Sequence, residues 1–296
     1  ELEFILIETV RKKVESILAS KKVERLDALL LGGILFFSLV VRIFNARMGL
    51  PYMHHWDEPE IAFNALDMLK EGNLNPDFFN YGSLLIYLNL GVDWLHALYL
   101  RALPAASPFA LSSLEYLRYG ANYGFDWYIS HPTFLFWNRV LTALFGTATV
   151  ALVYYFGLKL GTRLAAVAGA VLLAGTLFHV QHSAYVTTDV PMTFFVWCVL
   201  LFVYLYLDRH KNLYFILALV ASGLATSTKY NAGLVVIVPA AALFLGRKFE
   251  SYRPWLWALI PLVPALAFFV GTPYALFDFS TFYEDVRYEI LHYSVE

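Results

Sequence analysis

The apolar run LDALLLGGILFFSLVVRIF, residues 26–44, is followed shortly by the polar segment HHWDEPE, residues 54–60. A helix that crosses a bilayer needs about 20 predominantly apolar residues, and this run approaches that length. We therefore predict a membrane-spanning helix here, with the polar segment lying just beyond its end. An acidic pair at such a place points to chemistry at a membrane surface.

The composition of the whole chain supports a membrane protein. Of its 296 residues, 59% are hydrophobic and 18% are aromatic, and the mean hydropathy is +0.59. A soluble domain cannot bury that much apolar surface. The formal net charge of -2 gives no global electrostatic reason to expect a nucleic-acid partner. The single cysteine, Cys198, cannot form an internal disulfide.

Further apolar stretches bring the number of predicted spans to about seven. They are residues 27–44, 135–158, 164–181, 190–207, 213–228, 232–246 and 254–272. The predicted fold class is therefore an all-α polytopic membrane protein. Residues 1–25 are predicted to form a cytoplasmic amphipathic segment, with an apolar stripe and with Lys and Arg elsewhere. This segment either lies on the inner membrane surface or is a solvated or partner-docking helix. Residues 26–296 are predicted to form the transmembrane core.

The stretch 81–103 is ambiguous, because it is apolar but contains Asn89, Asp93 and Arg101. Cytoplasmic loops collect Lys and Arg, and the basic clusters all fall on one side only if this stretch does not cross. We therefore predict an interfacial or re-entrant helix inside one large outer loop, residues 45–134. The acidic residues then gather on the outer face.

Asp57 and Glu58 are the leading candidates for chemistry, because a carboxylate at a membrane exit can act as a general base. The same segment also fits a helix start over residues 58–71, with Asp57 as N-cap, Glu60 completing a capping box and Gly72 as the stop. Capping explains neither Glu58 nor the histidines before it. We predict catalytic roles for Asp57 and Glu58.

Other candidates come from later segments predicted to reach the same face. Asp189, the third predicted catalytic acid, precedes the span 190–207. It either caps that helix or takes part in the site by positioning or tuning the first acid. Arg139 and Lys229 are cations at the outer ends of spans, suited to binding a phosphate, although basic side chains there also snorkel to lipid headgroups. Arg42 is expected to be an interface anchor. Candidate substrate-binding residues are His54, His55, Tyr81, His182 and Tyr230.

A metal site is the competing use of the residues around Asp57. His54, His55, Asp57 and Glu58 are plausible ligands by type, but their spacing matches no established metal motif. We predict no cofactor, and a divalent metal is the less favoured alternative.

The ordered set of motifs resembles membrane glycosyltransferases of the GT-C superfamily, in the branch of protein O-mannosyltransferases and the aminoarabinose transferase that acts on lipid A. The resemblance covers nearly all of residues 26–296. It is carried by WDEP at 56–59, NPDFFNYGSL at 75–84, NRVLTALFG at 138–146, and SAYVTTDVP at 183–191 with TKY at 228–230. Gly82 stands where proline is common in that family.

This resemblance implies an inverting glycosyltransferase that takes a sugar from a polyprenyl-phosphate donor in the membrane. Asp57 matches the catalytic base, Glu58 and Asp189 match neighbouring acids, and Arg139 and Lys229 match cations near the donor phosphate. The implied acceptor is a protein, lipid or glycan. The site is expected on the exterior face of a plasma or inner membrane. Family members usually continue further, so the resemblance implies a chain truncated at its C-terminus.

Two other functions remain open at this point. A glycosyltransferase-like scaffold could serve as a non-catalytic subunit of a larger membrane complex. A transporter is the second alternative, although the polar residues are predicted to cluster at one membrane face and not at the midplane where transporter sites lie.

Overall fold

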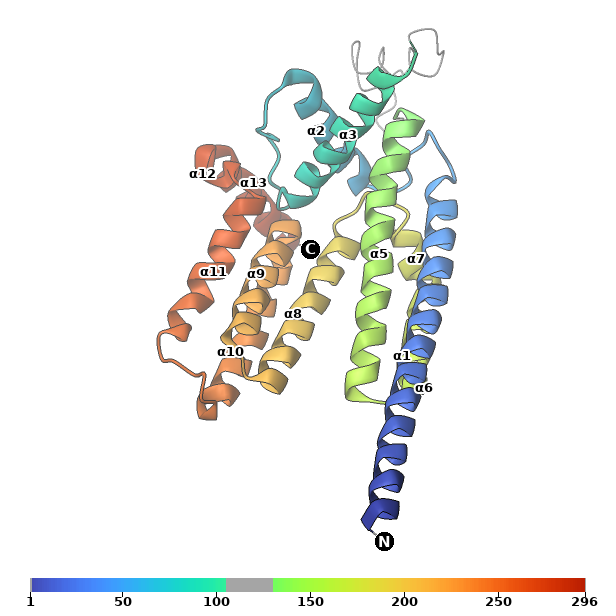
Figure 1. Ribbon diagram of the computed structural model, residues 1–296. Helices are drawn as coiled ribbons and strands as arrows, with labels where there is room; N and C mark the ends of the chain where they lie inside the picture. Colours follow the sequence, from blue (N-terminus) through green and yellow to red (C-terminus); the bar gives the residue numbers. More distant parts are fainter. Residues whose placement is uncertain (1, 105–129, 296) are drawn as a thin grey trace.

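A computed structural model describes residues 2–104 and 130–295, with the side chains of residues 24–104 and 130–292. The described residues form helices and no strand, which confirms the predicted all-α class. Long helices run lengthwise through the molecule, and α2, α3, α12 and α13 gather at the end far from the N-terminus (Figure 1). Residues 105–129 of the predicted outer loop lie outside the described residues.

The helices follow one another with short connections. In chain order they are α1 (Leu2–Ala46), α2 (Asp57–Glu71), α3 (Leu84–Ala102), α5 (Pro132–Leu160), α6 (Arg163–Gly175), α7 (Leu177–His182), α8 (Asp189–Arg209), α9 (Asn212–Thr228), η1 (Tyr230–Val236), α10 (Ile237–Leu245), η2 (Gly246–Lys248), α11 (Leu256–Gly271), α12 (Tyr274–Phe277) and α13 (Phe279–Val295). Helix α1 begins at Leu2 and includes the rest of the predicted cytoplasmic segment without a break.

Among the described residues, four helical segments are long and apolar enough to cross a membrane: Glu24–Ala46, Pro132–Leu160, Asp189–Arg209 and Tyr230–Lys248. The apolar helices α6, α9 and α11 are shorter. Together these segments coincide with the predicted spans, although the number of actual crossings stays a prediction. Helix α3 is not one of the membrane-length apolar helices.

Two polar residues of α3 face the protein, whereas Arg101 at its end is exposed. Asn89 and Asp93 are fully buried, and Asn138 on α5 donates a hydrogen bond to Asn89 at 2.8 Å. Burial raises the pKa of Asp93 well above its usual range. The polar face of α3 is therefore covered by α5, which explains how a helix with these residues sits beside apolar spans.

The predicted span 164–181 is interrupted at Thr176, between α6 and α7. Arg42 of α1 donates to the carbonyls of Ala174 and Leu173, at 3.3 and 3.5 Å, which lack helical partners at the end of α6. The expectation that Arg42 anchors at the interface is wrong. Its side chain is fully buried and also contacts His179 Nδ1 at 2.7 Å, because inward acceptors replace the water it would find outside.

Helix α2 covers the predicted helix, but the predicted cap is wrong. Trp56 occupies the N-cap position without a side-chain cap bond, and Asp57 is the first helical residue, so its carboxylate turns elsewhere. Gly72 ends the helix as expected, in the left-handed region with φ 68°. Ile61 and neighbouring apolar residues pack against α3 and α5, which fixes the start of α2 at one end of the bundle.

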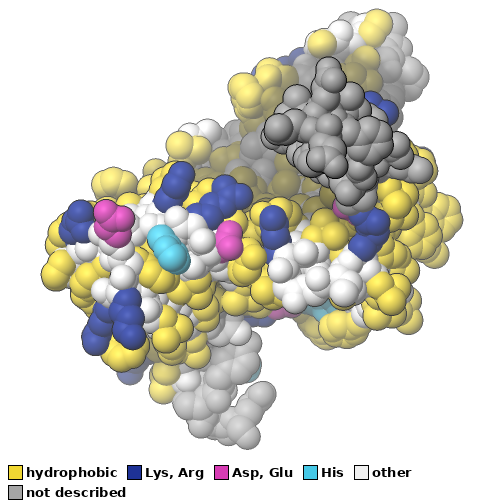
Figure 2. Space-filling view, turned by 60° about the horizontal axis from the view of Figure 1, so that its bottom comes forward, with side chains coloured by type: hydrophobic (Ala, Val, Ile, Leu, Met, Phe, Trp, Pro, Cys, Tyr) yellow, Lys and Arg dark blue, Asp and Glu magenta, His cyan; other side chains and the backbone are white. Residues whose placement is uncertain are grey.

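Basic residues mark the opposite end of the bundle, where α5, α8 and η2 finish and α6, α9 and α11 begin. Lys and Arg side chains gather over this end and apolar side chains surround them (Figure 2). The residues concerned are Lys159, Arg163, Arg209, Lys211, Arg247, Lys248 and Arg253. The gathering of these basic residues at one end agrees with the basic clusters used to predict the topology, although Asp27 also lies there and pairs with Arg163.

Helices α12 and α13, which sequence analysis did not predict, return the chain to the acidic end. Phe282 of α13 packs against Phe79 and Tyr230, with ring centroids 5.8 and 6.4 Å apart. The Asp285 carboxylate accepts a hydrogen bond from the Phe79 amide at 2.7 Å, and Asp278 accepts one from Asn75 at 2.9 Å. Helix α13 is therefore fixed to the segment between α2 and α3.

Candidate functional site

The Asp57 carboxylate is held at the first turn of α2 by a tyrosine from the next connection. The Tyr81 hydroxyl donates a hydrogen bond to Asp57 Oδ1 at 3.0 Å. The Asp57 side chain keeps 14% of its surface exposed, so it is sheltered but reachable. Burial, and after it the charge of Asp57, raises the pKa of nearby Glu60. The Asp57 carboxylate is therefore held in one orientation and can still be reached by a substrate.

Histidines connect Asp57 to the second acidic segment. His55 Nδ1 lies 3.9 Å from Asp57 Oδ2, and the His55 ring meets the His182 ring edge-on at 5.5 Å between centroids. The His182 ring lies close enough to Asp57, Asp189 and Lys229 to interact with the charge of each. These side chains form one cluster. The exposed His54 ring lies against Gly49, and the His54 backbone amide donates a hydrogen bond to Glu58.

Lys229 pairs with Asp189 across the α9–η1 junction and the start of α8. Its Nζ lies 2.7 Å from Asp189 Oδ1, and both side chains are partly exposed, 26% for Lys229 and 39% for Asp189. Asp189 is the first residue of α8, and Thr188 occupies the N-cap position, which contradicts the capping alternative for Asp189. Lys229 is therefore a cation within reach of a ligand.

Glu58 and Arg139 form a fully buried ion pair beneath this cluster. Arg139 donates to both Glu58 oxygens, at 2.7 and 2.9 Å. Its remaining N–H groups reach the carbonyls of Ala46, Met48 and Tyr52 at 3.0 to 3.4 Å.

Glu58 also ties two further segments to the pair. It accepts hydrogen bonds from the backbone amides of His54, at 2.9 Å, and Val186, at 3.0 Å. The carboxylate thus joins α5, the α1–α2 connection and the connection before α8 around the start of α2. Every N–H of Arg139 already has a protein acceptor.

Close packing and Tyr230 position the segment that carries Tyr81. The Tyr230 hydroxyl lies 2.7 Å from the Phe79 carbonyl and 3.0 Å from the Tyr81 carbonyl. A Cβ atom on Gly82 would lie 2.1 Å from the Ser227 carbonyl oxygen, so any larger residue there must push the segment away from α9. Gly82, a departure from the expected proline, thus permits the close approach of this segment to α9.

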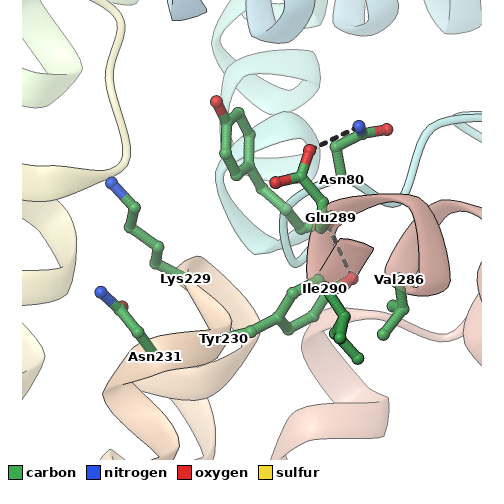
Figure 3. Close-up of a pocket in the computed structure, with 8 residues that line it drawn as sticks. Asn80, Lys229, Tyr230, Asn231, Val286, Glu289 and Ile290 are labelled. Carbon is green, nitrogen blue, oxygen red and sulfur yellow. Dashed lines mark hydrogen bonds between the residues drawn. The ribbon is translucent and has the colours of Figure 1, made fainter. Parts of the chain in front are cut away.

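A cavity of about 560 Å³ opens beside Tyr81 and Lys229, within the size range of small-molecule sites. Asn80, Tyr81, Lys229, Tyr230, Asn231, Val286, Glu289 and Ile290 line it. The lining comes from the α2–α3 connection, the α9–η1 junction and α13 (Figure 3). The cavity thus adjoins the tyrosine that holds Asp57 and the lysine that pairs with Asp189.

Within the described residues, no group of three or more His, Cys, Asp or Glu side chains is arranged to hold a metal ion. The sequence predicted the members of the cluster around Asp57, Asp189 and Lys229. It did not predict Asn80, Asp285 and Glu289, which lie where α13 contacts the α2–α3 connection. The spacing of Asp278, Phe282, Asp285 and Glu289 repeats one helical face, and that periodicity could have identified a docked helix.

Replacing Tyr81 with Phe is expected to lower activity by about 10-fold or more, because a hydrogen bond to a charged group contributes about 1.5–3 kcal/mol. The ring would keep its place while Asp57 loses its hydroxyl donor. The measurement is the initial rate in a transfer assay. Tyr87→Phe, which removes a hydroxyl that donates to the Leu74 carbonyl, is the matched control. Equal rates for the two variants would contradict a role for the Tyr81–Asp57 contact.

The described residues form a helical bundle of a polytopic membrane protein. At one end of the bundle, the acids Asp57 and Asp189, the accessible Lys229 and a cavity lie close together, as in an enzyme site. The family model for dolichyl-phosphate-mannose-protein mannosyltransferase matches residues 110–278. The chain belongs to this family of GT-C membrane glycosyltransferases, which confirms the resemblance seen in the sequence. The matched range includes Arg139, Asp189 and Lys229, whereas Asp57 and Glu58 precede it.

One curated relative, an uncharacterized protein of Aquifex aeolicus (strain VF5), is 35% identical over 107 residues. The alignment covers 36% of this chain and 21% of the relative, so the chain matches a minor part of that longer protein. No solved structure matches the chain.

Proposed function

We propose that this chain transfers a sugar, mannose by family, from a polyprenyl-phosphate donor to an acceptor hydroxyl, with inversion at the anomeric carbon. The observation that carries the proposal is that Tyr81 connects the Asp57 carboxylate to a cavity that Lys229 also lines. A base and a phosphate-binding cation beside one cavity are the groups this displacement needs.

In the proposed reaction, Asp57 takes the proton of the acceptor hydroxyl while the oxygen attacks the anomeric carbon. The bond from that carbon to the phosphate oxygen breaks, and the phosphate leaves with the electron pair. Lys229 stabilises the charge on the leaving phosphate, and Asp189 keeps the lysine oriented. His55 and His182 lie where they would contact substrate beside Asp57.

Glu58 and Arg139 are assigned positioning roles in this proposal. Their polar atoms are engaged with one another and with the backbone, so a phosphate at Arg139 would have to displace protein acceptors. Of the two cations predicted to bind phosphate, the partly exposed Lys229 is the better placed.

The acidic end of the bundle is proposed to face the cell exterior. The basic residues at the opposite end would then lie in the cytoplasm, as the distribution of Lys and Arg in membrane proteins favours. The donor would reach the site from the membrane, and a protein, lipid or glycan acceptor would reach it from outside.

The test is transfer from radiolabelled polyprenyl-phosphate sugars to a peptide acceptor by the purified protein in nanodiscs. Mannosyl, glucosyl and aminoarabinosyl donors are compared. Label on the acceptor in an α/β configuration opposite to that of the donor supports the proposal. A folded protein that transfers from no donor would instead favour the non-catalytic subunit, and net flux of donor across a vesicle membrane without transfer would favour a transporter.

Replacing Lys229 with Met is expected to weaken donor affinity by about 10- to 100-fold, because a charge-assisted hydrogen bond to the phosphate is lost. Lys229→Arg should retain most of the affinity, since it keeps the cation. Binding is measured with the polyprenyl phosphate alone. Lys70→Met, which breaks the pair between Lys70 and the half-exposed Asp67 on α2, serves as control. Unchanged affinity in Lys229→Met would remove Lys229 from the site.

A further inference from the structure

Glu289 of α13 presents a carboxylate to the cavity from a fixed position. Its Oε1 accepts a hydrogen bond from Asn80 Nδ2 at 2.7 Å. In Figure 3 the second oxygen points away from Asn80, toward the side of the cavity where Lys229 lies. One oxygen is thus held by the protein while the other is directed at the space beside Tyr81.

The helix that carries Glu289 is itself anchored on the same segment. Asp285, one helical turn before Glu289, accepts a hydrogen bond from the Phe79 amide at 2.7 Å. Phe282 packs against Phe79 and Tyr230. The carboxylate and the Tyr81 segment therefore belong to one packed unit, and preorganised polar groups of this kind give a site its specificity.

The cavity is chemically divided between its two charged residues. The Lys229 ammonium attracts a phosphate, whereas the Glu289 carboxylate repels one. An ionised carboxylate offers acceptors only, which suits a ligand rich in hydroxyl donors. Val286 and Ile290, on the same helix, supply an apolar surface beside it. A neutral sugar joined to a phosphate matches this arrangement when its phosphate lies at Lys229 and its sugar lies at Glu289.

We propose that Glu289 is the specificity-determining residue for the transferred sugar. Its free carboxylate oxygen accepts a hydrogen bond from one sugar hydroxyl, while the phosphate of the same donor lies at Lys229. This inference rests on the proposed function, because it assumes a sugar phosphate as the ligand. The inference assigns part of donor recognition to α13, a helix that lies outside the range 110–278 matched by the family model.

The experiment measures equilibrium binding and transfer separately, with polyprenyl-phosphate mannose and its monodeoxy analogues. Glu289→Gln is the test variant, because the amide oxygen can still accept from Asn80 while the charge at the cavity is removed. Glu284→Gln, an exposed position on the same helix, is the matched control. Thermal unfolding of both variants shows that the fold is retained.

For the wild type, one deoxy analogue should bind about 10- to 100-fold more weakly than the mannosyl donor. Glu289→Gln should bind the mannosyl donor several-fold more weakly than the wild type does. The variant should bind that deoxy analogue almost as well as the mannosyl donor, because the carboxylate that would accept from the missing hydroxyl has already been removed. Glu284→Gln should match the wild type. An equal loss across all donors would show that Glu289 only holds Asn80, and wild-type binding by Glu289→Gln would remove it from the site.

The readouts distinguish this inference from the proposed function. If the wild type transfers no sugar but the analogue pattern depends on Glu289, the sugar subsite stands and the catalytic proposal fails. If transfer occurs and the discrimination among analogues is the same in Glu289→Gln as in the wild type, the catalytic proposal stands and the subsite fails.

Discussion

Asp57→Asn is expected to lower the rate of sugar transfer by about 10²- to 10⁴-fold, the range over which a positioned general base contributes. The amide has nearly the same shape and can still accept from Tyr81, so the fold and the cavity should remain. It cannot take a proton from the acceptor. The measurements are single-turnover transfer and donor binding, and only the first should change.

Asp67→Asn is the matched control for this prediction. Asp67 lies on the same helix and pairs with Lys70 at 3.1 Å on its more exposed side. That variant should transfer at the wild-type rate. A rate for Asp57→Asn within a few-fold of the wild type would show that another group accepts the proton, and Asp57 would be left as an orienting residue at the start of α2.

Breaking the buried pair should have the largest effect on stability. Arg139→Met is expected to destabilise the fold by about 3–5 kcal/mol, because it leaves Glu58 charged and fully buried without its cation. The measurement is thermal or denaturant unfolding in detergent micelles. Activity should fall as well, since Glu58 holds the first turn of α2, which carries Asp57.

The double variant Glu58→Gln/Arg139→Met separates charge from geometry. Removing both charges should recover part of the lost stability, because the buried unpaired charge disappears. Recovery should be incomplete, since the amides of His54 and Val186 lose a charged acceptor and three backbone carbonyls lose their donor. A double variant no more stable than Arg139→Met would contradict the role of the ion pair.

Periodicity and charge predicted the parts of this fold that depend on local sequence. Runs of apolar residues predicted the membrane-length helices. The polar content of the stretch 81–103 and the distribution of Lys and Arg predicted an interfacial or re-entrant helix there, but not that Asn89 and Asp93 are buried against α5. The break between α6 and α7 could not be predicted in this way. It depends on Arg42, a residue from a different helix, which turns inward to satisfy carbonyls at the end of α6.

The site likewise has residues that the sequence predicted and contacts that it could not predict. Asp57 and Lys229 stood out because charged residues at the ends of apolar runs have few structural explanations. Residue type alone could not show that Arg139 is enclosed by Glu58 and backbone carbonyls, whereas Lys229 stays partly exposed. The carboxylates of α13 were missed because their partners, Phe79 and Asn80, lie some 200 residues earlier in the chain.

The contacts of Glu58 have a consequence for how the protein is made. This carboxylate binds Arg139, 81 residues later, and the Val186 amide, 128 residues later. Contacts of such sequence separation form only after long loops have closed. During synthesis the spans would emerge one after another, and Asp57 would have no fixed setting until α5 and the connection before α8 had joined it. An incompletely inserted chain would therefore contain the proposed base but no assembled site, so the proposed sugar transfer would start only once the bundle has closed.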